Sequence, residues 1–154
     1  MSNYHIAQIN IARMLAPIDD PIMAEFAAQL APVNALADES PGFIWRLQSE
    51  SGDATSIQIY DDDLIIINLT VWESVDALRG FVFKGAHHGV LRDRKRWFEK
   101  IEGPYYALWW LPAAHFPSPE EGKERLDYLR KHGDSAYAFS FRNVFPQPSE
   151  VING

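Results

Sequence analysis

The chain has 154 residues, of which 47% are hydrophobic and 13% aromatic, and it contains no cysteine. This size and composition predict one folded domain over residues 1–154, and the lack of cysteine excludes thiol nucleophiles, zinc–thiolate sites, iron–sulfur clusters and disulfides. The formal net charge of -7 argues against a nucleic-acid partner, because affinity for phosphate backbones comes from clustered Lys and Arg.

The first ten residues have neither the basic nor the apolar region of a signal peptide. Nowhere does the sequence contain the roughly 18 uninterrupted apolar residues that a membrane-spanning helix needs. We therefore expect a cytoplasmic protein with no membrane partner.

Hydrophobic periodicity and turn residues predict the element order β-α-β-β-α-β-α-β. The expected strands are 4–12, 43–48, 64–72, 105–111 and 137–144, with a weak extra strand near Ile57. The expected helices are 21–38, a piece that follows Ser74 and pauses near Gly85, a continuation over 86–100, and 119–132. The elements up to the strand 105–111 form the split βαβ arrangement of a ferredoxin-like α+β fold, in which helices cover one face of an antiparallel sheet. The open face then needs a partner.

The predicted strand 64–72 has two different faces. Its odd-numbered residues are all aliphatic, which suits a layer of helices. Its even-numbered residues pass from apolar to polar to aromatic and include Asn68 and Trp72, which suits a cavity or a second sheet. In the first strand, Gln8 and Asn10 share one face, where they either line a cavity or meet solvent.

The predicted helix 86–100 places His87 and Arg94 on its apolar face, because residues seven apart point the same way. A histidine on such a face is more often a core residue than a catalyst, but two ionisable groups on one buried stripe need partners or a ligand. His88 and most of the basic run after it point outward. Neighbouring helical residues diverge by about 100°, so the histidine pair is a poor metal site.

Several segments together resemble a known family. They are YHIAQINIARMLAPIDDP, DDDLIIINLTVWESVDALRGFVF, AHHGVLRDRKRWFE, LWWLPAAHFPSPEEGKERLDYLR and AFSFRNVFP. They resemble a bacterial family of uncharacterised single-domain proteins. That family is similar to the dimeric α+β barrel superfamily, which includes antibiotic-biosynthesis monooxygenases, haem-degrading enzymes and aldoxime-dehydratase-like haem proteins. The resemblance implies a homodimer in which two protomers pair sheet to sheet, each enclosing a pocket between its sheet and its helices.

Within these segments, the resemblance places His87, rather than His88, at the family's helical histidine. The residues that match the motif that follows are Trp97, Phe98, Trp109, Trp110, Pro112, His115 and Pro117. The chain departs from the pattern at Ala114, where the family has glycine, and at His88, where the family has another residue.

Three functions of different classes are compatible with these features. In a monooxygenase-like enzyme without a cofactor, His87, Arg94 and His115 perform acid–base catalysis or bind an oxyanion, because an imidazole gains and loses a proton near neutral pH. The residues that hold its small aromatic or other hydrophobic substrate are Asn68, Trp72, Trp97 and Trp109. In a non-covalent haem protein, His87 or His115 is the axial ligand and an arginine meets a propionate. In a non-catalytic dimeric ligand-binding protein, the tryptophans belong to the core.

Overall fold

The computed structural model describes residues 3–48, 60–87 and 94–148. Its strands are β1 (Tyr4–Met14), β2 (Phe43–Arg46), β3 (Ile65–Trp72), β4 (Phe98–Glu99) and β5 (Tyr106–Pro112). Its helices are α1 (Ala24–Asp38), α2 (Val75–His87) and α3 (Pro119–His132), with single 3₁₀ turns at Pro21–Met23, Arg94–Arg96 and Phe141–Asn143. The predicted strand near Ile57 and the outward position of His88 lie outside the described residues.

The strands lie in the order β2-β3-β1-β5, and each neighbouring pair is antiparallel. β4 pairs with Arg13 and Met14, on the same edge of β1 as β5. α1 connects β1 to β2, and α2 follows β3 on the way to β5. This is the split βαβ connectivity, so the predicted ferredoxin-like α+β fold is confirmed.

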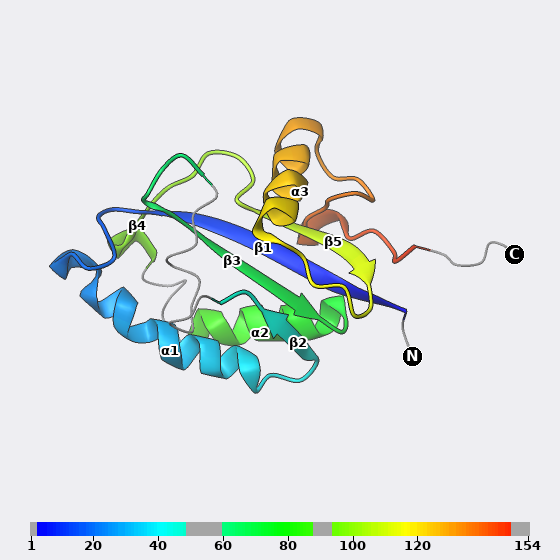
Figure 1. The fold of residues 1–154 in the computed structure, drawn as a ribbon, viewed down its shortest axis with the longest axis horizontal. Helices are drawn as coiled ribbons and strands as arrows, with labels where there is room; N and C mark the ends of the chain where they lie inside the picture. The colour runs from blue at the N-terminus through cyan, green and yellow to red at the C-terminus, as the bar shows by residue number, and fades with distance from the viewer. Residues whose placement is uncertain (1–2, 49–59, 88–93, 149–154) are drawn as a thin grey trace, which may run out of the picture.

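The two helices of this unit share one face of the sheet, as predicted, and α3 lies on the other (Figure 1). Leu78 of α2 packs with Trp72 of β3, and Phe26 of α1 packs with Met14 of β1. These sheet residues belong to the mixed face, whereas the aliphatic face receives α3 alone. On the mixed face, Phe81 of α2 stacks on Trp72, and Phe26 of α1 lies in the cluster that contains Met14.

α3 approaches the sheet closely through Gly122, where a Cβ atom would lie 2.8 Å from Ile9 Cδ1. Leu126 and Leu129 of the same helix are buried in the cluster that contains Ile9. The helix begins as predicted, because the Ser118 side chain accepts a hydrogen bond from the backbone N–H of Glu121. The core therefore has a layer on each side of the sheet.

None of the helices in the described ranges has the length and hydropathy of a bilayer span.

The predicted continuous helix over 86–100 is wrong. α2 runs through Gly85 and ends at His87, and Phe98–Glu99 is a strand. β5 pairs with β1 only as far as Asn10, so the end of that edge of β1 needs a second partner, which β4 supplies. Trp97 and Phe98 at the same time pack against Phe26 of α1, with ring centres 5.8 and 4.8 Å away. A continued helix would satisfy neither requirement.

The predicted strand over 137–144 is also wrong. Phe139 alone pairs with Leu108, with N···O distances of 2.7 and 2.9 Å. The Asp134 side chain then accepts from the backbone N–H of Ser140, and the Ser140 side chain accepts from that of Arg142. These local hydrogen bonds compete with a sheet ladder and turn the chain into a 3₁₀ turn.

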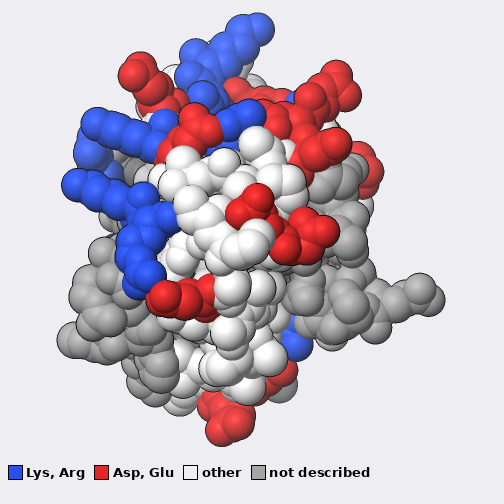
Figure 2. Space-filling view, turned by 90° about the vertical axis from the view of Figure 1, so that its left-hand side faces the viewer, with Lys and Arg blue, Asp and Glu red and all other residues white. Residues whose placement is uncertain are grey.

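Charged side chains at the end of the molecule where β1 meets β4 are paired. Arg13 binds Asp62 at 2.7 Å and also Glu99, and Arg96 binds both carboxylate oxygens of Glu25 at 2.8 Å. Figure 2 views the molecule from the left-hand side of Figure 1, and there acidic groups adjoin basic ones. The Arg13 hydrogen bond lowers the pKa of the Asp62 carboxyl below its ordinary value.

Candidate functional site

A band of polar side chains crosses the α1/α2 face of the sheet between two apolar clusters. Asn68 of β3 lies opposite Asn10 of β1, and Asn10 lies opposite Tyr106 of β5. Gln8 and Thr70 form the next cross-strand pair on the same face. We refer to these five residues as the polar band. Its members come from three neighbouring strands, so the sheet itself fixes their spacing.

The Asn68 side chain is exposed, and it lies just beyond Thr70, where the pairing of β3 with β2 ends, while β1 still pairs with it on the other edge. Its chain neighbours Ile67 and Leu69, which face α3, are 5% and 1% exposed. Asn10 and Tyr106, beside it in the band, are half-buried. An exposed residue between buried chain neighbours lies where the neighbouring layer does not cover the sheet. Among the described residues, the α1/α2 layer leaves the sheet uncovered at Asn68, and we refer to this place as the opening.

Trp72 closes one side of this opening as part of the core. Its ring is fully buried, stacked on Phe81 at 5.1 Å and edge-on to Phe43 at 5.4 Å. Its indole N–H donates to Thr70 Oγ1 at 2.9 Å, and Thr70 Oγ1 bonds Gln8 Oε1 at 3.0 Å. Trp72 therefore orients polar side chains of the band instead of lying free to stack on a ligand.

Trp97 lies beyond the other side of the band. It is buried in the cluster beneath α1, with Phe26 and Met14, and the Arg96 guanidinium lies 5.4 Å from its ring centre. Its position in the structure is that of a core residue.

The backbone of His87 and Arg94 is described, but their side chains are not. α2 contains 13 residues, which span about 20 Å, the length of about six strand residues. α2 follows β3 in the chain and runs back along the sheet (Figure 1), and His87 is its last residue. Arg94 begins a separate 3₁₀ turn, so helical spacing no longer relates it to His87.

Trp109 and His115 lie on the opposite side of the sheet, with α3. Trp109 is fully buried, and its indole N–H donates to Glu121 Oε2 at 3.1 Å. The other carboxylate oxygen of Glu121 lies 2.9 Å from Nε2 of the exposed His115. The structure therefore brings Asn68 and Trp72 together on one face, but it does not bring Trp109 and His115 to them.

Sequence reasoning did not single out Thr70 and Tyr106. Thr70 shares its strand face with Asn68, Tyr106 lies on an apolar and aromatic strand face, and neither residue forms a motif in its own segment. The signal that could have found them is a polar residue on the same face of three neighbouring strands. Reading that signal requires the pairing of β1 with both β3 and β5.

Within residues 3–48, 60–87 and 94–148, no group of three or more histidine, aspartate or glutamate side chains is arranged to hold a metal ion. The polar band consists of two asparagines, a glutamine, a threonine and a tyrosine, which are all neutral hydrogen-bonding groups. What this arrangement can do chemically is to orient a molecule and donate hydrogen bonds to its oxygen atoms.

Comparison with known proteins gives one family match. A family model described as a domain of unknown function (DUF3291) matches residues 5–153. No curated protein matches the chain.

Several solved structures are similar. SnoaB from Streptomyces nogalater, a cofactor-independent oxygenase solved as a mutant, is 15% identical to this chain and has a TM-score of 0.48. The match covers 75% of this chain and 97% of the SnoaB chain. A monooxygenase from the gene ActVA-Orf6 of Streptomyces coelicolor, solved with the ligand nanaomycin D, is 20% identical, with coverages of 75% and 95% and a TM-score of 0.39. The NE2512 protein of unknown function from Nitrosomonas europaea is 9% identical, with coverages of 76% and 96% and a TM-score of 0.45.

Proposed function

Because the chain belongs to the DUF3291 family, whose description names no activity, we propose its function from the site. The protein binds a small aromatic or other hydrophobic molecule in the opening at Asn68 and acts on it as a monooxygenase-like enzyme. The observation that carries the binding site is the exposed Asn68 side chain between buried chain neighbours, at one end of the polar band. A few convergent polar groups among apolar surroundings are typical of a small-molecule site.

The surroundings of Asn68 set the class of molecule. Apolar clusters beneath α1 and α2 lie on the two sides of the polar band, and the half-buried ring of Tyr106 lies within it. Neutral amides and hydroxyls orient a ring system that carries oxygen atoms, whereas a phosphate would require cations.

The reaction class comes from the sequence resemblance to antibiotic-biosynthesis monooxygenases. Without a cofactor, the substrate itself passes electrons to O₂, and it does so most readily after losing a proton. Asn68 is the proposed donor to the resulting oxyanion. His87 is the proposed base, because the sequence resemblance places it at the family's helical histidine. Arg94 stays a proposed second oxyanion partner, now from the 3₁₀ turn before β4 and without the helical spacing that first grouped it with His87. Trp109 and His115 are left out because they lie on the other face of the sheet.

The other functional classes receive less support from the described residues. His115, a candidate haem ligand, has its Nε2 atom bonded to Glu121, and no further observation favours haem. We retain the homodimer and the single domain over residues 1–154 as parts of the proposal.

The proposal is tested with anthrone, a three-ring molecule whose central ring carries a carbonyl and, opposite it, an acidic CH₂ group. Its oxidation consumes one O₂, places one oxygen atom in the product as a new carbonyl and releases the other in water. We expect the protein to accelerate O₂ uptake, and Asn68→Ala to reduce that acceleration roughly a hundredfold, the typical effect of losing an oxyanion donor. Asn143→Ala is the matched control, since Asn143 is an exposed residue whose amide bonds Asp134.

Equal activity of the Asn68→Ala and Asn143→Ala proteins would place the chemistry elsewhere. If the wild-type protein binds anthrone, the Asn68→Trp protein does not, and O₂ uptake is not accelerated, the protein is a binding protein and not an enzyme for this molecule. Binding is measured by the quenching of tryptophan fluorescence.

A further inference from the structure

Gln8 and Thr70 are two buried polar side chains at the centre of the sheet. Gln8 is 7% and Thr70 3% exposed, and they lie directly opposite each other on β1 and β3. Ser40 is the other buried polar residue in the described part of the chain, and its hydroxyl donates to a backbone carbonyl at the end of α1. A buried polar side chain costs free energy unless all its hydrogen-bonding groups find partners.

Trp72 fixes the direction of hydrogen bonding between these two residues. An indole N–H can only donate, so Thr70 Oγ1 accepts from Trp72 Nε1 at 2.9 Å. The Thr70 hydroxyl then gives its own proton to Gln8 Oε1 at 3.0 Å. Turning the Gln8 amide over would leave that buried proton without an acceptor among the described residues. The relay therefore holds the amide with its oxygen toward Thr70 and its nitrogen turned away.

The Gln8 nitrogen carries two N–H groups and makes no hydrogen bond to any residue in the described ranges. Two residues further along the same face of β1 is Asn10, which lies opposite the exposed Asn68. Most of the Gln8 side chain is buried, but its nitrogen is not among the buried polar atoms that lack a partner, so it keeps contact with solvent. Its unused donors are therefore accessible to an acceptor, either water or a ligand.

We infer that Gln8 determines specificity at this site, by offering a fixed amide N–H donor to an acceptor oxygen of the ligand. This inference rests on the proposed function, since it concerns the same opening. It narrows the ligand to aromatic molecules that carry a carbonyl or phenolate oxygen, such as ketones, quinones and phenolates. An aromatic amine of the same size would place its own donors against those of Gln8 and gain nothing.

Three matched probes test the inference by isothermal titration calorimetry: acetylnaphthalene, which carries an acceptor oxygen; ethylnaphthalene, which carries no polar atom; and naphthylamine, which carries a donor. The wild-type protein should bind acetylnaphthalene roughly tenfold more tightly than ethylnaphthalene, and naphthylamine no more tightly than ethylnaphthalene. Gln8→Met should remove the preference for acetylnaphthalene.

Thr70→Val is the decisive variant, because it leaves Gln8 in place and removes the hydroxyl that fixes its orientation. It also removes the acceptor of the Trp72 N–H, a loss that would weaken the binding of all three probes alike and not change their order. The freed amide can turn its oxygen toward an amine, so naphthylamine should bind within about threefold of acetylnaphthalene. Thr70→Ser keeps the hydroxyl and should keep the wild-type order of affinities. Ser40→Ala, which removes a buried hydroxyl elsewhere, should keep it too.

The outcomes separate this inference from the function on which it rests. If the wild-type protein binds all three probes equally and Asn68→Trp blocks them, the site stands and the role of Gln8 is overturned. If Thr70→Val keeps the wild-type order, the role of Gln8 is likewise overturned. If no probe binds the wild-type protein, the proposed function fails and the inference fails with it. Should Gln8→Met not fold, the comparison of Thr70→Ser with Thr70→Val still decides.

Discussion

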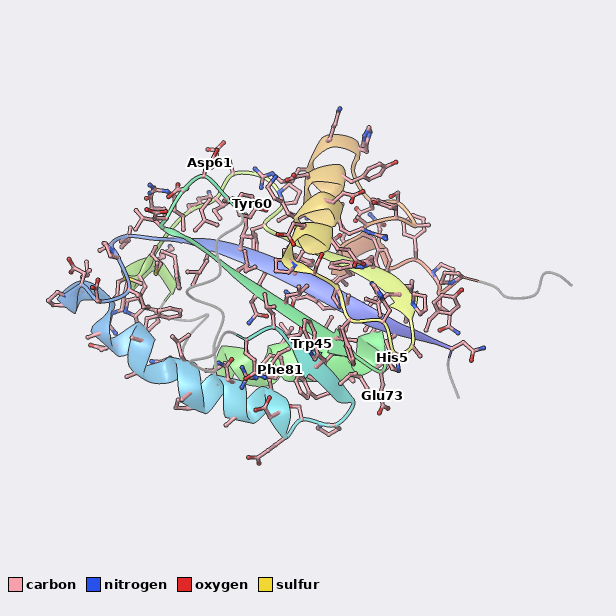
Figure 3. The ribbon with its side chains drawn as sticks, in the orientation of Figure 1. His5, Trp45, Tyr60, Asp61, Glu73 and Phe81 are labelled. Carbon is pink, nitrogen blue, oxygen red and sulfur yellow. The ribbon has the colours of Figure 1, made fainter. Side chains whose placement is uncertain are left out.

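Tyr60 has a buried hydroxyl oxygen that lacks a hydrogen-bond partner within the described part of the chain. Tyr60 packs against the hydrophobic cluster beneath α3, and Lys123 Nζ lies 5.1 Å from its ring centre. It is therefore on the α3 side of the sheet, whereas Phe81 of α2 lies on the other side (Figure 3). Burial, and next the carboxylate of Asp127, raise the pKa of Tyr60 to about 12. The phenol therefore stays neutral to high pH, yet it gains no hydrogen bond in return.

We predict that Tyr60→Phe raises the free energy of unfolding by about 1 kcal/mol, because it removes a buried polar group that has no partner. Urea denaturation near neutral pH measures the change.

The raised pKa of Tyr60 also implies that the contribution of the neutral phenol to stability is complete below pH 10.0, the ordinary value, and is lost as the pH rises through about 12. Tyr60→Phe should reduce that alkaline loss. Tyr128→Phe, at an exposed tyrosine, is the control, and a Tyr60→Phe protein less stable than wild type would contradict the argument.

At the scale of elements, α3 is fixed to the sheet at its first turn by one carboxylate. Glu121 accepts from the Trp109 indole of β5 with one oxygen and meets His115 of the preceding loop with the other. Its backbone N–H is at the same time bonded to the Ser118 side chain that begins the helix. Strand, loop and helix are thus joined at a single residue.

We predict that Glu121→Ala lowers the free energy of unfolding by roughly 1–3 kcal/mol, because it leaves the buried Trp109 N–H without a partner. Glu120→Ala is the matched control, since Glu120 is an exposed acid in the same helical turn. Thermal unfolding followed by circular dichroism compares the two proteins. Equal effects of the two substitutions would mean that helix charge, and not the Trp109 hydrogen bond, sets the stability.

Alternation and capping residues are sufficient to predict most elements of this fold. They place β1, β3, β5 and α3 close to their true bounds, because each has a clear hydrophobic period or a side-chain cap. α1 is located through Asp20, whose side chain caps the 3₁₀ turn before that helix. The helical spacing of residues after His87 is misleading, because Trp97 and Phe98 satisfy long-range contacts with α1 and β1 that no local pattern contains.

The candidate site is predictable only in part, for a related reason. Alternation along β3 correctly puts Asn68 and Trp72 on one face, but it cannot say which face of β5 lies beside them. That depends on the cross-strand register, in which Ala7 pairs with Trp109 and so turns Trp109 toward α3. The predicted site residues Asn68 and Trp72 therefore lie on one face of the sheet, and Trp109 lies on the other.

At the scale of the whole molecule, the α3 face of the sheet is only partly covered. α3 packs over β1 and β5, while Ile44, Trp45 and Ile65 on the β2 side remain half-buried. Phe116, from the loop before α3, stacks on Trp45 at 5.5 Å and is itself 51% exposed. This is the face on which the sequence resemblance implies that a second copy of the chain pairs, and an exposed aromatic pair suits the centre of such a contact.

We predict that the protein sediments as a dimer and that Phe116→Glu shifts it to a monomer, because a carboxylate at a buried aromatic contact would lose its water without gaining a partner. The monomer itself should fold, since Phe116 is half-exposed in a single protomer. Ile22→Glu is the control: Ile22 is equally exposed, at 52%, but it lies in the 3₁₀ turn before α1 and not on the α3 face. Sedimentation velocity over a range of concentrations distinguishes the states. A monomeric wild-type protein would refute the dimer, and a Phe116→Glu dimer would place its interface on another surface.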